Sequence, residues 1–477
     1  MNKTGVLIGI DAGNTNLKCV AIEPNGRCVK LVRMPAGESR FSDDADRLFA
    51  DICRILQETV ASLPAGCDVL GVAVSSGGCS AFCTAGNGKQ IPFERPGSFV
   101  VPDDCTDATG YPPQYHNSGI VLMNTVSDLS RVAHVFSYSD YIAYRLCGEV
   151  GREISTAGSM SMYDRRTGGW WDAFKSATGF TDDVLGVVCS SGTKIGEITA
   201  EAVALTGLAQ GVPVCSGGHD YLCAAFALGC VDEGNLLNVL GTYEMVTSFY
   251  RNRVTYPAGI QAFSDCHCYP GRYSLTCETL GGAQLEWLRS ILPGGDRPDF
   301  WNRMYDQIDS LPDAFTGGEN ELLIPRIYGE CFPVSDPSLC GGFVGLTSKT
   351  DPGRMLRAAI IGLSMYSKRM LDFAGLENVS FITAAGGGSQ GRFWMQTKAD
   401  FLGLPVIVPH VPEASATGAA LLAGIGAGVY CGHDEACKIY VDTTKTEYLP
   451  NTERGKKYIN IYDEVFLPAL DYQSAPE

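Results

Sequence analysis

Apolar residues recur along this chain with two different spacings, and the two spacings alternate. Near the N-terminus three short apolar runs, at residues 6–10, 17–22 and 27–32, have the length and the bounding turns of β-strands. Residues 45–60 carry apolar side chains at helical spacing, and residues 68–75 return as a strand. Three strands, a helix and a strand form the first part of a βββαβα unit, which predicts a mixed α/β domain.

The same plan recurs after the middle of the chain. Two strands, at residues 235–240 and 244–249, flank a small loop just as the first two strands do. The two spacings predict further helices at 138–146, 353–373, 394–402, 413–428 and 458–470, and further strands at 211–216, 381–385 and 405–408. We therefore predict two lobes and a terminal extension, at residues 1–249, 250–435 and 436–477.

The composition fits a soluble globular chain and argues against some classes of partner. The chain has 477 residues, enough for two large lobes, and 45% of them are hydrophobic. Its formal net charge of −17 argues against a nucleic acid or an anionic membrane as partner, because both require clustered Lys and Arg. The charge does not argue against a nucleotide, which backbone amides and Mg2+ can hold.

We expect a cytoplasmic protein with reduced cysteines. The apolar run at 6–10 is far shorter than the core of an export signal, and the longest apolar stretch, at 419–429, is too short to span a bilayer. Nineteen cysteines without an export signal are expected to be thiols, most of them buried. Cys266, His267 and Cys268 form a local metal-like cluster, but on a strand the imidazole would face away from both thiols, so no metal is expected there.

Polar residues crowd the turn between the first two strands. Asp11, Gly13, Asn14, Thr15 and Lys18 all lie in or beside this turn. Glycine lets backbone amides face a phosphate, hydroxyl and amide side chains donate further hydrogen bonds, and the carboxylate can hold Mg2+ through water. A plain hairpin turn without a ligand is the alternative.

Two further glycine-rich segments carry candidate chemistry. Gly217 and Gly218 precede His219 and Asp220, and the small apolar residues after Asp220 predict a buried helix. Asp220 is either the cap of that helix or a general base. The turn at 386–390 follows a strand and precedes a helix, an arrangement in which a flat or anionic ligand can meet the backbone closely.

Taken in order, these segments resemble the FGGY family of carbohydrate kinases. The matching segments are residues 11–18 and 240–242 for two phosphate loops, 139–149 for an Asp-Tyr-hydrophobic helix, 218–220 for a catalytic Asp, and 329–333, 342–346 and 386–403 for motifs of the second lobe. The last segment is the closest match, to the family's adenosine-binding motif. Several motifs in the right order are far more specific than any one of them.

The resemblance implies a fold and an activity. The fold would be the two-lobe, α/β actin-like ATPase fold, built from duplicated ribonuclease H-like βββαβα domains with an interlobe cleft. The activity would be ATP-dependent phosphorylation of a hydroxyl of a small sugar or polyol, with Mg2+. The overall spacing is similar to that of xylulokinases, which favours a ketose such as xylulose as substrate. A homodimer is compatible with the resemblance.

The resemblance also implies roles for individual residues. Asp220 would be the catalytic base that accepts the proton of the attacking hydroxyl. ATP would contact Gly13, Asn14, Thr15, Lys18, Gly241, Thr242, Gly387, Gly388, Ser389 and Gln390, with Gln396 as an alternative at the edge of the adenine site. The sugar would contact His219, Asp220, Ser76 and Gly77, and the metal would lie near Asp11 and Asp220.

One segment departs from the family pattern. Sugar kinases of this family usually carry a Trp-x-Asp-x-Arg segment that lines the sugar site, and the corresponding residues 91–109 contain no Trp. Two alternatives therefore stay open, namely a catalytically silent ATP- and sugar-binding protein of the same fold, and a nucleotide-dependent interaction protein, which actin and Hsp70 exemplify.

Overall fold

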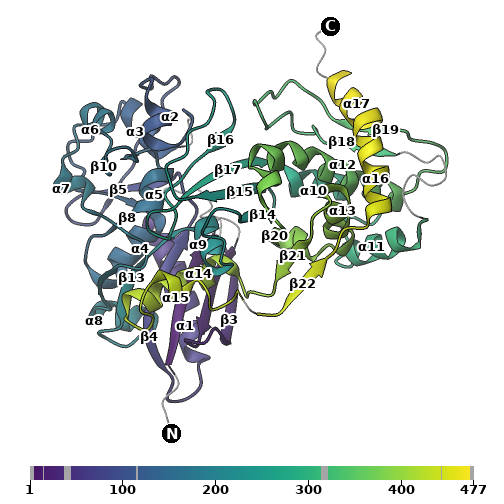
Figure 1. The fold of residues 1–477 in the computed structure, drawn as a ribbon. Coiled ribbons are helices and arrows are strands. Elements are labelled where there is room, and N and C mark those ends of the chain that lie inside the picture. The colour runs from purple at the N-terminus through teal and green to yellow at the C-terminus, as the bar shows by residue number, and fades with distance from the viewer. Residues whose placement is uncertain are drawn as a thin grey trace.

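Two large β-sheets organise the chain, one in each of the two lobes seen in Figure 1. The computed structural model describes residues 5–13, 16–36, 44–113, 117–312, 321–441 and 443–472. The first sheet has the strand order β12-β13-β4-β1-β2-β3, and the second has the order β16-β17-β15-β14-β20-β21-β22. Asn14 and Thr15, two of the predicted phosphate-loop residues, lie outside the described residues.

The first sheet contains the strands predicted near the N-terminus. Its strands are β1 (Gly5–Ala12), β2 (Asn16–Ile22), β3 (Cys28–Pro35), β4 (Asp68–Ser76), β12 (Lys194–Glu197) and β13 (Pro213–His219). One face packs against α1 (Ala45–Ala61), α4 (Tyr138–Cys147) and α8 (Ala200–Thr206) through a continuous apolar core. Apolar side chains at helical spacing, such as Phe49, Ile52 and Leu56 of α1, supply the helical side of that core.

A separate group of short elements extends the first lobe between β4 and β12. Its helices are α2 (Cys105–Thr109), α3 (Ser118–Asn124), α5 (Ile154–Ser159), α6 (Asp172–Thr178) and α7 (Asp182–Leu185), and its strands are β5 (Ala81–Thr84), β6 (Gln90–Ile91), β7 (His134–Ser137), β8 (Arg152–Glu153), β9 (Tyr163–Asp164), β10 (Gly169–Trp170) and β11 (Val188–Cys189). Trp171 and Phe174 are buried in its core.

The second sheet repeats the plan of the first. Its strands are β14 (Leu236–Leu240), β15 (Glu244–Tyr250), β16 (Ala262–Phe263), β17 (Tyr273–Thr279), β20 (Ile382–Ala385), β21 (Val406–Pro409) and β22 (Lys445–Tyr448). β14 pairs antiparallel with β15 and parallel with β20, just as β1 pairs with β2 and β4. The duplicated arrangement of strands predicted from the sequence is therefore present.

Four longer helices surround the second sheet. They are α10 (Gly281–Ile291), α11 (Phe300–Ser310), α12 (Pro352–Phe373) and α13 (Arg392–Leu402), and a small ribbon of β18 (Leu322–Ile324) and β19 (Gly342–Val344) packs beside α12. Within the described ranges, no helix is both long and apolar enough to cross a membrane.

The division of the chain between the two sheets differs from the predicted division into lobes. The strands change sheet between His219 and Leu236, earlier than residue 250, because β14 is hydrogen-bonded to β20. The helices α14 (Ala414–Gly426) and α15 (His433–Ala436) lie against the first lobe, although they follow β21 and precede β22 of the second (Figure 1). Residues 236–250 thus belong to the second sheet, and α14 covers the first.

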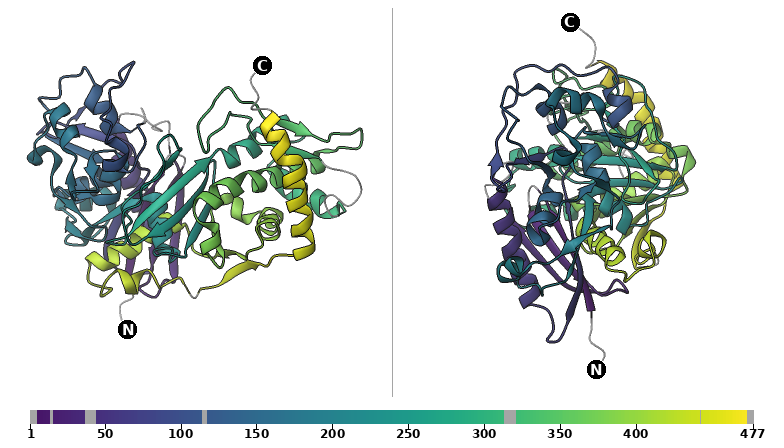
Figure 2. Two further views of the ribbon diagram at one scale, coloured as in Figure 1. Left: turned by 45° about the horizontal axis from the view of Figure 1, so that its top comes forward. Right: turned by 90° about the vertical axis from the view of Figure 1, so that its left-hand side faces the viewer.

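The C-terminal helices return to the second lobe. They are α16 (Thr452–Ile461), a π-helical turn (Tyr462–Phe466) and α17 (Leu467–Tyr472), drawn in yellow along the second lobe in Figure 2. Tyr458 and Phe466 are buried beside Ile361 and Tyr366 of α12. The apolar residues at helical spacing in this tail therefore pack it against the second lobe, as the sequence indicated.

Helix α14 approaches the first sheet and α9 (Asp220–Ala227) so closely that no side chain fits between their backbones. A Cβ at Gly9 of β1 would lie 1.8 Å from the carbonyl oxygen of Ala416. A Cβ at Gly418 of α14 would lie 1.9 Å from the carbonyl oxygen of Cys223 in α9. Since both obstacles are backbone atoms of packed helices, neither can move without shifting a whole element.

We expect Gly9→Ala to lower the free energy of unfolding by at least about 2 kcal/mol, because the added methyl group must push α14 away from β1. Urea denaturation followed by circular dichroism measures the change. Gly97→Ala is the matched control, since a Cβ there meets no atom within 4 Å. Equal stability of both variants and the native chain would contradict this account of the packing.

Candidate active site

The candidate residues of the first lobe lie in one row, at the carboxyl ends of three neighbouring strands. β1, β4 and β13 are parallel, and Ser76 pairs in register with Ala12 on one side and with His219 on the other. Asp11, Ser76 and Gly77 therefore lie beside His219 and Asp220. The carboxyl ends of parallel strands are where open α/β sheets usually bind ligands.

Asp11 is a buried carboxylate with one oxygen unused. Its Oδ2 accepts a hydrogen bond from Lys18 Nζ at 3.0 Å, whereas its Oδ1 has no hydrogen-bond partner among the described residues. Burial raises the pKa of Asp11 to about 6; the charge of Lys18 lowers it, and the charges of Asp220 and Glu413 add to the rise. A bound cation would favour the ionised form of this carboxylate.

Lys18 links the first loop to α14. Its Nζ lies 3.4 Å from Oε2 of Glu413, the residue that precedes α14, and Glu413 also pairs with Arg33 of β3. Gly13 lies at the tight turn itself, where a Cβ would come within 2.8 Å of the carbonyl oxygen of Asn16. Lys18 is thus held at the loop by two carboxylates and does not point freely into solvent.

Asp220 is the first residue of α9 and keeps part of its surface exposed. Its Oδ1 accepts a hydrogen bond from the backbone N–H of Tyr221 at 2.6 Å, and 35% of its side chain is accessible. The capping position before the helix is taken by His219, whose side chain makes no capping bond. This bond to the neighbouring amide uses only part of the hydrogen-bonding capacity of the Asp220 carboxylate. A role in capping the helix therefore does not account for the whole side chain.

His219 belongs to a buried network that sequence patterning did not reveal. Asp265 Oδ2 accepts hydrogen bonds from Tyr111 Oη at 2.7 Å and Tyr221 Oη at 2.8 Å, and it lies 3.4 Å from His219 Nδ1. Burial lowers the pKa of His219, but the nearby carboxylates of Asp265 and Asp220 outweigh it and raise that pKa above its usual value. The partners of Asp265 lie 44 and 154 residues away along the chain, at Tyr221 and Tyr111, so no local motif marks them.

Glu278 of β17 brings a further carboxylate from the second sheet. Burial raises the pKa of Glu278, and the charge of His219 partly opposes that rise. Burial also raises the pKa of the Cys79 thiol, and Asp265, Glu278 and Asp220 each add to the effect. The charges of three carboxylates therefore act on Cys79. The neighbouring Gly78 lies against His219, because a Cβ there would meet the imidazole ring at 2.6 Å.

A cavity of about 510 Å3 in the second lobe collects half of the residues predicted to contact ATP. Its lining includes Gly241, Thr242, Gly387, Gly388 and Gln390. The two loops meet because β14 and β20 are adjacent parallel strands, with Val239 opposite Ala385. Ser389 does not line the cavity; it is buried, and its Oγ donates a hydrogen bond to the Gly386 carbonyl oxygen at 2.7 Å.

The opposite wall of this cavity comes from helices that the sequence reading did not single out. Trp301, Asn302 and Tyr305 of α11 line it, with Gly282 and Glu286 of α10. Gly282 lies against the second phosphate loop, because a Cβ there would come within 2.2 Å of the Gly241 carbonyl oxygen. The aromatic pair at positions 301 and 305, one helical turn apart, is the sequence signal that could have indicated this wall.

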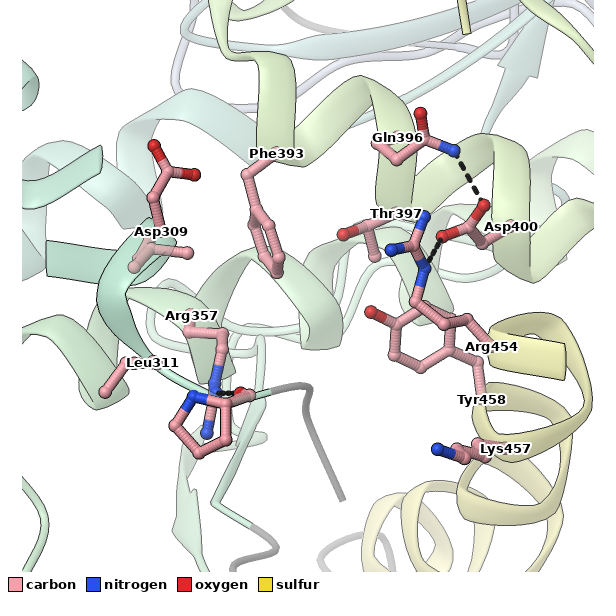
Figure 3. Close-up of a pocket in the computed structure, with 12 residues that line it drawn as sticks. Asp309, Leu311, Arg357, Phe393, Gln396, Thr397, Asp400, Arg454, Lys457 and Tyr458 are labelled. Atoms are coloured by element: carbon pink, nitrogen blue, oxygen red, sulfur yellow. Dashed lines mark hydrogen bonds and ion pairs between the residues drawn. The ribbon is translucent and has the colours of Figure 1, made fainter. Parts of the chain in front are cut away.

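Gln396 and Asp400 lie on the far side of α13, at the smaller cavity of Figure 3. Asp400 accepts hydrogen bonds from Gln396 Nε2 at 2.7 Å and from Arg454 Nε at 2.6 Å, and this pairing fastens α13 to α16. The cavity measures about 190 Å3. Gln396 therefore does not line the cavity of about 510 Å3, and its hydrogen bond to Asp400 serves the packing of α13.

The first-lobe carboxylates fit a magnesium ion held mainly by phosphates. Mg2+ in phosphoryl-transfer sites is bound by one or two carboxylates together with substrate oxygens and water. Asp11, with its unpartnered Oδ1, and the half-exposed Asp220 provide such a pair. No group of three or more His, Cys, Asp or Glu side chains suited to a metal occurs within the described part of the chain.

Comparisons with known proteins give a consistent result. Residues 121–227 match the N-terminal domain of the FGGY family of carbohydrate kinases, and residues 286–427 match its C-terminal domain. The chain is 26% identical to L-fuculokinase of Escherichia coli strain K12, over 94% of this chain and 98% of that protein.

Solved structures of sugar kinases share the fold. Xylulose kinase from Rhodospirillum rubrum superposes with a TM-score of 0.83 at 22% identity, covering 98% of this chain and 99% of that one. Glycerol kinase from Plasmodium falciparum, solved with ADP, gives a TM-score of 0.82 at 14% identity, covering 100% and 99% of the two chains. These likenesses confirm the predicted two-lobe, actin-like ATPase fold.

We expect Gly387→Val to weaken binding of ADP at least tenfold without lowering the melting temperature. Gly387 lines the nucleotide cavity, and a Cβ there meets no protein atom within 4 Å, so the new side chain occupies space that a nucleotide would use. Isothermal titration calorimetry measures the affinity. Gly86→Val, where a Cβ is equally unobstructed, is the control; unchanged ADP affinity in Gly387→Val would remove this cavity from nucleotide binding.

Proposed function

The chain belongs to the FGGY family of carbohydrate kinases, and from this membership we propose that it transfers the γ-phosphoryl group of ATP to a hydroxyl of a neutral ketose such as xylulose. The observation that carries the proposal is the row of Asp11, His219 and Asp220 at the carboxyl ends of the first sheet. The glycine-lined cavity of the second lobe supports it, because it supplies a separate place for the nucleotide.

In the proposed reaction Asp220 accepts the proton of the attacking hydroxyl. It is the carboxylate in the row that combines partial exposure with a fixed position at the start of a buried helix. His219, oriented by Asp265, contacts the sugar and helps to position the hydroxyl beside Asp220. Such transfers depend mainly on alignment and on neutralisation of charge, which Mg2+ supplies when it is bound.

Lys18 and Asp11 act on the nucleotide side of the site. Asp11 in its ionised form would hold Mg2+, and Lys18 favours that form by lowering the pKa of Asp11. Gly13, Gly241 and Thr242 donate hydrogen bonds to phosphate oxygens from two loops of the same type, one in each lobe. Gly387, Gly388 and Gln390, with the aromatic side chains of α11, hold the adenosine.

The charges around the sugar site favour a neutral substrate. Asp220, Asp265 and Glu278 give the region around Cys79 a negative potential. Carboxylates accept hydrogen bonds from sugar hydroxyls, but they repel the carboxylate of an acid sugar such as gluconate. Ketoses and polyols therefore fit this site better than aldonic acids.

A catalytically silent ATP- and sugar-binding protein is the second candidate. It is favoured by residues 91–109, which lack the Trp usual in the sugar site of the family. In this chain the neighbouring Tyr111 stacks on Phe263 with ring centroids 5.0 Å apart and binds Asp265, so an aromatic residue still organises the region. An assay of ADP release separates the two candidates.

We expect ADP release with a ketose such as xylulose to exceed ADP release with gluconate, and Asp220→Asn to lower the turnover at least a hundredfold. The amide keeps the shape of the side chain but cannot accept the proton. A coupled enzymatic assay across ketoses, aldoses, polyols and gluconate measures both effects, and ADP titration checks that the variant still binds nucleotide.

Asp182→Asn is the matched control for the Asp220 variant, because it changes an acidic residue at the start of another helix, α7, where it pairs with Lys175. Its turnover should equal that of the native chain. Near-native turnover of Asp220→Asn would exclude Asp220 as the base, and an absence of ADP release with every substrate would favour the silent protein.

The pH profile should report the ionisation of Asp11. Since the pKa of Asp11 is about 6 and its ionised form is needed, kcat/KM should fall as the pH drops through about 6. Removing the positive charge in Lys18→Met raises that pKa, so the acid limb should move to higher pH. Lys175→Met is the control, and an acid limb that stays in place in Lys18→Met would contradict the role of Lys18.

A further inference from the structure

A second polar cavity lies between the extension of the first lobe and the hairpin that leads into β17. It measures about 290 Å3, and its lining includes Arg165, Arg166, Ser190 and Arg272. None of its lining residues lines the nucleotide cavity. We call this space the arginine cavity.

Arg165 is a buried cation without a counter-ion. Only 6% of its surface is exposed, its Nη1 donates a hydrogen bond to Ser264 Oγ at 2.6 Å, and its Nε has no acceptor among the described residues. No described carboxylate lies within ion-pair distance of it, and burial lowers its pKa. A buried guanidinium without an ion-pair partner is energetically unfavourable, and a bound anion would offset that penalty.

Arg272 adds a second unmet donor to the lining of the cavity. Its guanidinium lies over the ring of Tyr269, 5.0 Å from the centroid, and its Nη2 is 3.4 Å from Asp232 Oδ2. Its buried Nε has no acceptor among the residues described. Two arginines in the lining of one cavity therefore each retain an N–H group without an acceptor in the described part of the chain.

Arg166 lines the same cavity but differs in its pairing. Its Nη2 donates to Asp164 Oδ2 at 2.7 Å and to Asp104 Oδ2 at 2.8 Å, and its Nη1 lies 3.6 Å from Asp107 Oδ2. Three carboxylates thus balance this guanidinium. The less balanced positive charge comes from Arg165, for which no ion pair is found among the described residues, and from Arg272, which shares the carboxylate of Asp232 with Arg251.

We propose that the arginine cavity binds the phosphate group of a small phosphate monoester of sugar-phosphate size, at a site separate from the nucleotide cavity. Guanidinium groups match phosphate oxygens in both charge and geometry. A volume of about 290 Å3 suits a pentose phosphate or inorganic phosphate and is small for a nucleotide. In the cavity of Figure 3, by comparison, Arg454 is paired with Asp400, and Arg357 donates a hydrogen bond to the Pro312 carbonyl oxygen.

Calorimetric titration of the full chain with ribose 5-phosphate, inorganic phosphate and ribose tests the proposal, and no turnover is needed. We expect ribose 5-phosphate to bind and ribose not to bind at this site. Arg272→Gln and Arg165→Met should each weaken the binding at least tenfold, because each removes a charged hydrogen-bond donor. Neither variant changes a residue proposed to bind the sugar or ATP, so any binding of the sugar phosphate at the catalytic site should persist. The decrease in the number of ligands bound per chain therefore reports the occupancy of the arginine cavity.

Arg166→Gln is the matched control, since it removes the same charge from the same cavity but from a guanidinium that carboxylates already balance. Its affinity should stay within about threefold of the native value. Arg272 is partly exposed, so its variant should fold even if Arg165→Met does not, and the melting temperature checks both. If inorganic phosphate bound with the same affinity as ribose 5-phosphate, the result would support the site and would assign it to free phosphate. Native affinity in Arg272→Gln, or equal binding of ribose, would overturn the proposal.

Discussion

The position of the candidate site depends on how closely three backbones approach one another. Gly9 of β1 and Gly418 of α14 leave no room for side chains, so α14 lies directly on β1 and on α9. Because Asp11 is the penultimate residue of β1 and Asp220 begins α9, this contact fixes the relative position of the two carboxylates that the proposed reaction uses. Small residues were needed here for geometry, and the apolar contacts of Ala416 and Ala420 then stabilise the arrangement.

Electrostatics give the site its second constraint. Burial raises the pKa of both Asp11 and Glu278, and the charges of Asp220 and Glu413 add to the rise at Asp11. Positive charge opposes these rises, because Lys18 lowers the pKa of Asp11 and the charge of His219 lowers that of Glu278. An anionic sugar would add further negative charge, whereas neutral hydroxyl groups can use the carboxylates as acceptors.

Local patterns predicted the elements and the glycine turns, but not the contacts between distant segments. Spacing and glycine content predict the strands around residues 11 and 240 and the turn at 386–390. The structure has a strand of the first sheet near residue 11, a strand of the second sheet near residue 240, and a turn at 386–390 after β20. Sheet membership could not be predicted, because β14 has the same pattern whichever sheet it joins, and hydrogen bonding to β20 decides it. The Tyr111–Asp265 bond joins residues with no common motif. At Ser389 the motif was recognised from the sequence, but the contact of its side chain was not predicted, because its hydroxyl donates a hydrogen bond to the backbone.

The path of α14 has a consequence for how the chain is made. The apolar face of the first sheet that includes Leu7 and Val20 is covered by a helix that begins only at Ala414. During vectorial synthesis on the ribosome, the lobe that emerges first must wait for almost the whole polypeptide before its core is sealed. Until then that face is exposed to solvent and is a natural target for chaperones. A gene cut between the two sheets would yield an amino-terminal fragment with the same exposed face, which would tend to aggregate.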